Sequence, residues 1–150
     1  MKVEVVDYQP SHVDEIMTMY PRSRELKFAR MAEWGDWKEV WRVHGAAFTL
    51  MIDGKPVGSA GVVPLGNGTG EAWAILSNVF DRYKKLVYLA TKKGLEKIIN
   101  DFGLKSVYAL IEPNFDEAQH FAYHLGFVKK EAGTFGPHGE AMFKFWRKCQ

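Results

Sequence analysis

The fold is decided by residues 71–130, which read EAWAILSNVFDRYKKLVYLATKKGLEKIINDFGLKSVYALIEPNFDEAQHFAYHLGFVKK. The pattern of apolar residues predicts a strand, a long helix, a second strand, a short helix and a third strand. Because two strands joined through a long helix imply a right-handed crossover, we expect the first two strands to be parallel and adjacent. The predicted elements are Glu71–Asn78, Arg82–Phe102, Ser106–Glu112, Phe115–His124 and a strand from Phe127 onward.

The short helix carries an apolar stripe at three- and four-residue steps that ends at Gly126. A glycine directly after such a stripe is typical of a helix end. We therefore expect Phe121, Leu125 and Phe127 to be largely buried, with the stripe facing the core.

The segment Pro113–Phe127 resembles the closing motif of the GNAT acyltransferases. Members of that family typically show an asparagine, then an alanine, then an aromatic residue, then Leu-Gly-Phe, and Asn114–Phe127 matches this order residue by residue. The preceding strand and long helix sit where the family has its acetyl-CoA-binding motif, so the resemblance covers the element order of nearly the whole chain. It implies an α/β (α+β) fold, with a mixed, mostly antiparallel sheet and a central parallel strand pair flanked by helices.

Length and composition predict one domain over residues 1–150. Hydrophobic residues make up 47% of the chain, which argues against disorder. The 20 basic and 18 acidic residues leave a net charge of +2, so there is no strong nucleic-acid signal. The only cysteine, Cys149, allows no internal disulfide. The histidines show no metal-ligand spacing beyond His120 and His124 at i and i+4, and that pair is interpreted as part of a helix face. With no signal peptide and no membrane-spanning run, we expect a cytoplasmic protein, and nothing in the sequence sets its oligomeric state.

The remaining strands are predicted to be antiparallel. Asp53-Gly54 separates two apolar runs and is typical of a two-residue hairpin turn. Pro64 is expected to end the second run, because proline cannot donate to a strand ladder. The predicted strands cover residues 2–8, 46–52, 55–63 and 141–146.

Residues Ser23–His44 are predicted to form a helical segment, and this segment is rich in tryptophan. Trp34, Trp37 and Trp41 recur at three- and four-residue steps, which puts them on one side of a helix. One interpretation is an aromatic stripe that faces the core. The other is a wall of the acceptor-substrate cleft, which this helical segment commonly borders in GNAT folds.

The GNAT resemblance implies an acetyl-CoA site between the first strand of the 71–130 stretch and the long helix. It places Leu76, Ser77 and Asn78 beside the cofactor, at the end of that strand. The family's phosphate loop has Gln or Arg, two residues, Gly, one residue, and Gly or Ala, and counting back from Gly103 puts it on residues 83–88. No glycine is present there, and a side chain at either glycine position blocks close approach of the phosphates.

Arg82, Tyr83, Lys84 and Lys85 stand at the predicted helix start instead. Cations at a helix N-terminus oppose the helix dipole, so the cluster is unfavourable unless an anion neutralises it. One interpretation is a side-chain clamp for the cofactor phosphates, and the other is an ordinary solvated turn. Nucleic-acid binding through this cluster is a third hypothesis, opposed by the lack of a long basic stripe.

Glu71 and Glu112 are the candidates for a general base, because GNAT catalysis often uses a carboxylate to deprotonate the acceptor amine. The family's usual general acid is a tyrosine directly after the aromatic residue of the closing helix, and Ala122 stands there. Tyr123 is the nearest tyrosine, but it lies about 100° further round the helix. Asn114 is expected to cap the closing helix, to contact the cofactor, or to do both.

The altered loop, the missing tyrosine and the tryptophan-rich first half together resemble the small GNAT-like proteins of tailed bacteriophages. The shared features are Trp73 in the predicted strand, a glycine-free basic loop and a Phe-x-x-x-x-Gly closing helix. Two functions follow from the resemblance. The first is an N-acetyltransferase that moves an acetyl group from acetyl-CoA to a small-molecule or protein amine, and the alternative is a catalytically inactive binding or virion-assembly protein.

Overall fold

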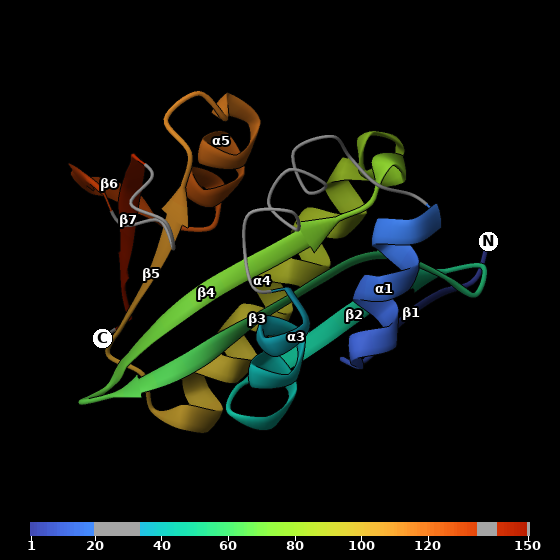
Figure 1. Cartoon of the computed structure of the whole chain (residues 1–150), viewed down its shortest axis with the longest axis horizontal. Coiled ribbons are helices and arrows are strands. Elements are labelled where there is room, and N and C mark those ends of the chain that lie inside the picture. Colours follow the sequence, from blue (N-terminus) through green and yellow to red (C-terminus); the bar gives the residue numbers. More distant parts are fainter. Residues whose placement is uncertain (20–33, 135–140, 150) are drawn as a thin grey trace.

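The computed structural model describes residues 1–19, 34–134 and 141–149, and within these ranges a seven-stranded sheet forms the centre (Figure 1). The strand order is β1-β2-β3-β4-β5-β7-β6. Every neighbouring pair is antiparallel except β4 and β5, which are parallel. The strands are β1 Val3–Asp7, β2 Ala46–Ile52, β3 Lys55–Gly66, β4 Thr69–Leu76, β5 Ser106–Ile111, β6 Val128–Gly133 and β7 Met142–Lys148.

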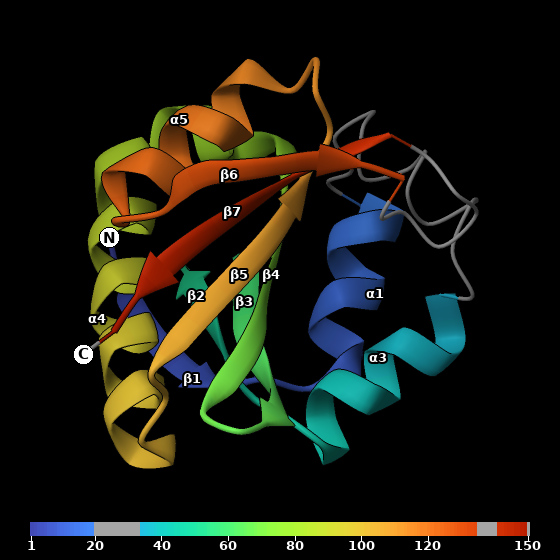
Figure 2. The same cartoon turned by 90° about the vertical axis from the view of Figure 1, so that its left-hand side faces the viewer.

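Helices cover both faces of the sheet (Figure 2). The helices α4 and α5 lie on one face, and α1 and α3 lie on the other. Within the described residues, no helix is both long and apolar enough to cross a membrane. The helices are α1 Pro10–Met19, α3 Trp34–Val43, α4 Lys84–Phe102 and α5 Asp116–His124, with a 3-10 helix, η1, over Asn78–Arg82.

The parallel pair confirms the prediction from the crossover pattern. β4 and β5 are adjacent, and their register runs from Thr69 opposite Ser106 to Ala72 opposite Ala109. The pairing stops there, although β4 continues to Leu76. The two strands therefore part toward their C-terminal ends.

The predicted bounds of β4 and α4 need correction. The strand ends at Leu76, before the predicted Asn78, and the helix begins at Lys84, two residues after the predicted Arg82. Between them the chain forms η1, because the Ser77 hydroxyl accepts a hydrogen bond from the Val79 amide. The Phe80 side chain, 3% exposed, anchors this turn in the core.

The Asp53-Gly54 hairpin is confirmed, with φ angles of 51° and 77° that match a type I′ turn. The prediction for Pro64 is wrong, because β3 continues to Gly66. The β2–β3 pairing ends at Val62, so Pro64 has no partner in β2. Because no β2 carbonyl lies opposite Pro64, the N–H that proline lacks is not needed on that side.

The core has parts on both sides of the sheet. Residues of α4 and α5 pack against the sheet around Val62, and Leu125 and Phe127 are buried there as predicted. Phe121 is only half-buried. On the other face, Trp41 is 4% exposed and packs in a cluster with Tyr8, Val13, Ile16 and Ile75.

The core interpretation of the tryptophan stripe holds for Trp41. The side chains of Trp34 and Trp37, and the part of the predicted helix before Trp34, lie outside the described residues, so the prediction stays open for them. Trp41 nevertheless lines the cavity described below, so its ring serves the core and the cavity together.

Candidate functional site

The candidate site lies where β4 and β5 part. Beyond Ala72, β4 stays paired with β3 as far as Leu76 but has no partner in β5. Backbone groups of residues 73–76 on the β5 side therefore face the gap between the two strands. This arrangement creates a strand edge in the middle of a sheet rather than at its border.

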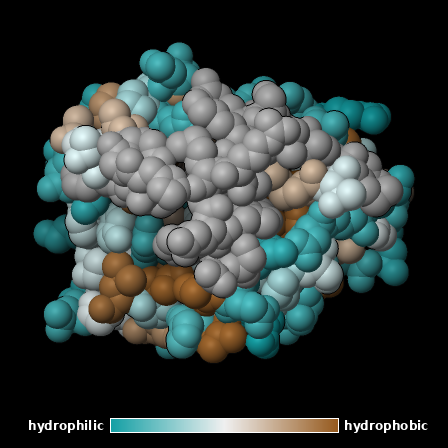
Figure 3. Space-filling model, viewed as in Figure 1, coloured by the Kyte–Doolittle hydropathy of each residue, from teal (hydrophilic) through white to brown (hydrophobic). Residues whose placement is uncertain are grey.

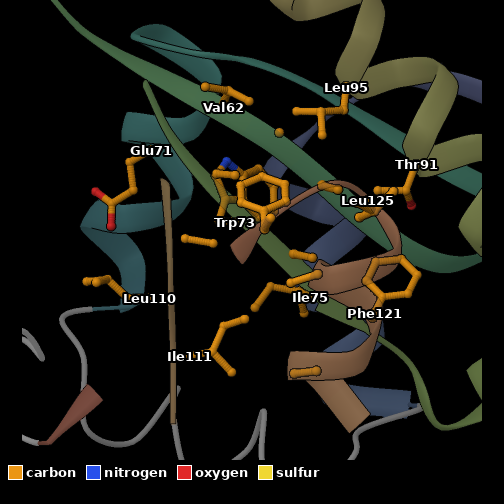
Figure 4. A pocket seen from close by; sticks show the side chains of 18 of the residues that line it. Val62, Glu71, Trp73, Ile75, Thr91, Leu95, Leu110, Ile111, Phe121 and Leu125 are labelled. Carbon is orange, nitrogen blue, oxygen red and sulfur yellow. The ribbon is translucent and has the colours of Figure 1, made fainter. Parts of the chain in front are cut away.

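A cavity of about 480 Å³ occupies the gap (Figure 4). Its volume falls in the range of small-molecule sites. It reaches both faces of the sheet, because Glu71 and Leu110 lie on one side of it, and Leu95, Thr91 and Leu125 lie on the other. The lining comes from α3, β2, β3, β4, β5, α4 and α5, with contributions from η1 and β7.

The two faces of the cavity differ in chemistry because side chains alternate along β4. Trp73 packs with the α1 and α3 cluster, whereas Ala72 packs with the α4 and α5 cluster. The α1 and α3 face carries the ionisable Glu71. Figure 3 shows hydrophobic side chains gathered in a strip on this same face of the molecule.

Glu71 is half-buried in the cavity wall. Burial raises the pKa of its carboxyl, while a hydrogen bond with Tyr108 and the positive charge of Lys144 act in the opposite direction. Tyr108 lies directly opposite Glu71 in the parallel register. Burial, and then the charge of Glu71, raise the pKa of Tyr108 to about 12, so its hydroxyl stays protonated and donates to the carboxylate.

Glu112 lines the same cavity, so the structure brings both predicted carboxylates to one site. It directly follows β5. The Gln119 side chain donates hydrogen bonds to the backbone carbonyls of Glu112 and Pro113, at 3.1 and 2.8 Å. These bonds fix the connection between β5 and α5, and with it the position of Glu112 at the parting strands.

Tyr123 and Asn114 are not among the residues that line the cavity. Tyr123 is 63% exposed on α5, with its ring centroid 5.9 Å from that of His124. Phe115, one residue after the predicted Asn114, takes the N-cap position of α5, and its side chain makes no cap hydrogen bond. Contact of Asn114 with a cofactor stays a prediction.

The predicted strand-end residues take three different positions. Leu76 lines the cavity. Ser77 is fully buried, and its hydroxyl caps η1. Asn78 is exposed as the first residue of η1. Leu76 is thus the one of the three whose side chain faces the candidate site.

The predicted phosphate loop over residues 83–88 is wrong, because Lys84 already begins α4. Tyr83 is the N-cap and makes no side-chain cap hydrogen bond, so no side chain at this position satisfies the first amides of α4. Lys84 and Lys85 are exposed there. The Lys84 Nζ lies 3.7 Å from an Asp81 carboxylate oxygen, which partly offsets the unfavourable charge at the helix start.

An aromatic cluster beside the site was not predicted. Trp73 stacks on Trp41 with ring centroids 3.9 Å apart and planes 10° apart, and the Tyr8 ring meets Trp73 edge-on at 5.3 Å. Among the residues that the structure describes, the buried Trp73 Nε1 has no hydrogen-bond partner. No local sequence pattern connects Trp73 with residues 8 and 41.

Comparison with known proteins gives structural matches only. No family model matches the sequence, and no curated protein matches it. A spermidine N-acetyltransferase chimera with a Vibrio cholerae parent matches with a TM-score of 0.73 at 10% identity, over 99% of this chain and 96% of its own.

Two further solved structures match the fold of this chain. An aminoglycoside acetyltransferase in complex with coenzyme A and kanamycin has a TM-score of 0.72 at 15% identity, over 98% of this chain and 95% of its own. A GNAT-family acetyltransferase from Bacillus anthracis has a TM-score of 0.72 at 12% identity, over 99% of this chain and 95% of its own. From these matches, the mixed sheet and the parting of β4 and β5, we conclude that the chain adopts the fold of the GNAT acetyltransferases.

Proposed function

We propose that the chain is an N-acetyltransferase that moves an acetyl group from acetyl-CoA to an amine. The parting of β4 and β5 carries the proposal, because residues 73–76 offer a strand edge beside a cavity that β5 leaves unpaired within the described part of the chain. Such an edge binds extended, amide-containing ligands through main-chain hydrogen bonds. The pantetheine arm of acetyl-CoA is such a ligand, and a structure of this fold holds coenzyme A.

The start of α4 is the proposed site for the cofactor phosphates. Amides at a helix N-terminus attract anions, and no side-chain cap competes for them at Tyr83. Lys84 and Lys85 add positive charge at the same place. Their side chains are exposed and can turn toward a phosphate, which would replace the glycine-rich cradle that the chain lacks.

Glu71 is the proposed proton acceptor. The raised pKa makes its carboxylate a stronger base than an ordinary surface glutamate. In the proposed reaction the ammonium of the acceptor loses a proton to Glu71, and its nitrogen attacks the thioester carbonyl. A C–N bond forms, the C–S bond breaks, and the coenzyme A thiolate leaves and takes up a proton. Glu112 is the second candidate for the base, and Tyr123 is too exposed to protonate a thiolate in the cavity.

Calorimetric titration with acetyl-CoA tests the binding step. We expect saturable binding that Lys84→Ala/Lys85→Ala weakens at least tenfold, because each charge-assisted bond contributes about 1.5–3 kcal/mol. The matched control is Lys92→Ala/Lys93→Ala, which removes two exposed lysines further along the same helix. Higher salt should weaken the wild type more than the Lys84→Ala/Lys85→Ala variant.

Two results would contradict parts of this proposal. If the two double variants bind equally, the lysine clamp is wrong although the enzyme survives. If millimolar acetyl-CoA does not bind at all, the result would favour the alternative that the resemblance implies, a catalytically inactive binding or virion-assembly protein. That phage resemblance itself stays a prediction.

Thiol release with a panel of primary amines tests the catalytic step. Glu71→Gln should lower turnover about 10²–10⁴-fold, as the loss of a general base does, with little change in acetyl-CoA binding. Glu112→Gln is the matched control from the neighbouring strand. A larger effect of Glu112→Gln would transfer the role of base to Glu112.

A further inference from the structure

The cavity extends beyond the gap between β4 and β5 into a side pocket under β3. The side pocket is the part of the cavity between β2, β3 and α4. Phe48 lies opposite Ala60 in the β2–β3 register, and Val62 lies two residues further along β3. The residues that line the side pocket are Phe48, Ala60, Val62, Thr91, Leu95 and Ile98.

The side pocket is apolar. Thr91 contributes the only polar side chain of the six lining residues, and none of the six is charged. Val62, Leu95 and Ile98 belong to the core cluster between the sheet and α4, so the space reaches into the hydrophobic interior. Water has few polar partners in such a space, and an apolar ligand would gain by filling it.

The position of the side pocket relative to the proposed donor decides what could fill it. A pantetheine arm along residues 73–76, with its phosphates at the start of α4, brings the thioester to Ala72, where the strands rejoin. Val62 lies directly opposite Ala72, and both residues pack in the α4 and α5 cluster. Glu71, the proposed base, lines the cavity from the opposite side (Figure 4). The amine therefore approaches from the Glu71 side, and the side pocket receives the other substituent of the thioester carbonyl.

We propose that the side pocket binds the acyl chain of the donor, so that the protein accepts short- and medium-chain acyl-CoA as well as acetyl-CoA and binds the longer donors more tightly. This inference rests on the proposed function and names its donor class. The bonds that form and break are the same as in acetyl transfer. The acyl carbon forms a bond to the amine nitrogen and loses its bond to the thiol sulfur. An acetyl group has one carbon beyond its carbonyl and would fill little of the side pocket, whereas a hexanoyl chain has four more methylenes to place there.

The test is calorimetric titration of the wild-type chain with coenzyme A, acetyl-CoA, butyryl-CoA and hexanoyl-CoA. We expect the dissociation constant to fall with each added pair of methylenes, with hexanoyl-CoA at least tenfold tighter than acetyl-CoA. Equal or weaker binding of hexanoyl-CoA would overturn the inference. If acetyl-CoA still binds, the proposed function stands; if none of the four binds, both fail.

Two substitutions that fill the side pocket sharpen the test. Ala60→Leu and Leu95→Phe should each remove the preference for hexanoyl-CoA and leave the acetyl-CoA dissociation constant within about threefold, because the strand edge and α4 start are untouched. Ala132→Leu on β6 is the matched control, since that residue is exposed and outside the lining, and it should keep the preference. A cooperative thermal transition shows which variants are folded. If Ala60→Leu or Leu95→Phe folds and still prefers hexanoyl-CoA, the inference is overturned. If neither variant folds, the titrations of the wild-type chain decide the question.

Discussion

Replacing Gly61 with alanine should destabilise the protein, because an added Cβ at this glycine would meet the backbone of β2. A Cβ at Gly61 would lie 2.5 Å from the Ala46 carbonyl oxygen and 2.6 Å from the Ala47 Cβ. Directly opposite residues in an antiparallel pair normally keep their Cβ atoms about 4.5–5.5 Å apart. Since β3 is paired on its other side with β4, it cannot move away from β2 without disturbing that pairing.

The size of the effect follows from two opposing contributions. Overpacking of this kind costs about 1–3 kcal/mol, and more where backbone atoms must move. Alanine in place of glycine within a strand regains about 0.5–1 kcal/mol of conformational entropy. We expect a net loss of about 2 kcal/mol, which lowers the melting temperature of a chain of this size by about 4–8 °C.

The assay is thermal and denaturant unfolding of Gly61→Ala beside Gly58→Ala, which makes the same substitution on the same strand. The nearest atom to a Cβ at Gly58 is the end of the Leu76 side chain, at 2.8 Å, and this side chain can rotate away. Gly58→Ala should therefore stay within about 1 kcal/mol of wild type. A Gly61→Ala variant as stable as Gly58→Ala would refute the β2–β3 register described here.

Three further substitutions have expected outcomes. Thr49→Val should cost about 1–3 kcal/mol in urea unfolding, because the buried Thr49 hydroxyl bonds both His12 Nδ1 and Ser59 Oγ at 2.8 Å; an unchanged midpoint would contradict that network. Phe80→Ala should cost about 3–5 kcal/mol by the same measurement, and a smaller loss would mean that Phe80 does not anchor η1. Glu71→Gln should gain stability relative to wild type as pH rises. The folded pKa of Glu71 is raised, so folding binds a proton between its unfolded and folded pKa values, and wild-type stability falls in that window. Denaturant midpoints measured from pH 3.5 upward check this, and a difference that does not vary with pH would exclude it.

Much of the fold could be predicted because its signals are local. The Asp53-Gly54 turn requires positive φ at both residues, and this chemistry fixes the hairpin without knowledge of the rest of the chain. The parallel pair followed from the spacing of two apolar runs around a long helix. Both signals depend on residues close together in the sequence.

The errors occurred where a distant contact decides local structure. η1 forms because Phe80 finds a place in the core with residues of β2, β3 and α4, and no periodic pattern in the sequence announces a single 3-10 turn. The N-cap of α5 is Phe115, although N-cap preferences favour the asparagine one residue earlier.

The candidate site was predictable as residue types but not as an arrangement. Glu71 and Glu112 were chosen from their positions on the predicted strands, and both line the cavity. The partner of Glu71 could not be chosen, because Tyr108 comes opposite it only through the exact register of β4 and β5. The stack of Trp41 on Trp73 likewise depends on how α3 packs over the sheet.

The proposed function requires a coenzyme A thioester to lie between β4 and β5, and amide NMR spectra recorded during a titration with acetyl-CoA test this most directly. The largest shift changes are expected at the amides of residues 73–76, which form the free strand edge, and at Lys84 and Lys85 at the start of α4. The exposed end of α4 around Asp101 should stay unchanged and serves as the internal control. Changes confined to surfaces away from the parting strands, or no changes at millimolar acetyl-CoA, would contradict the account.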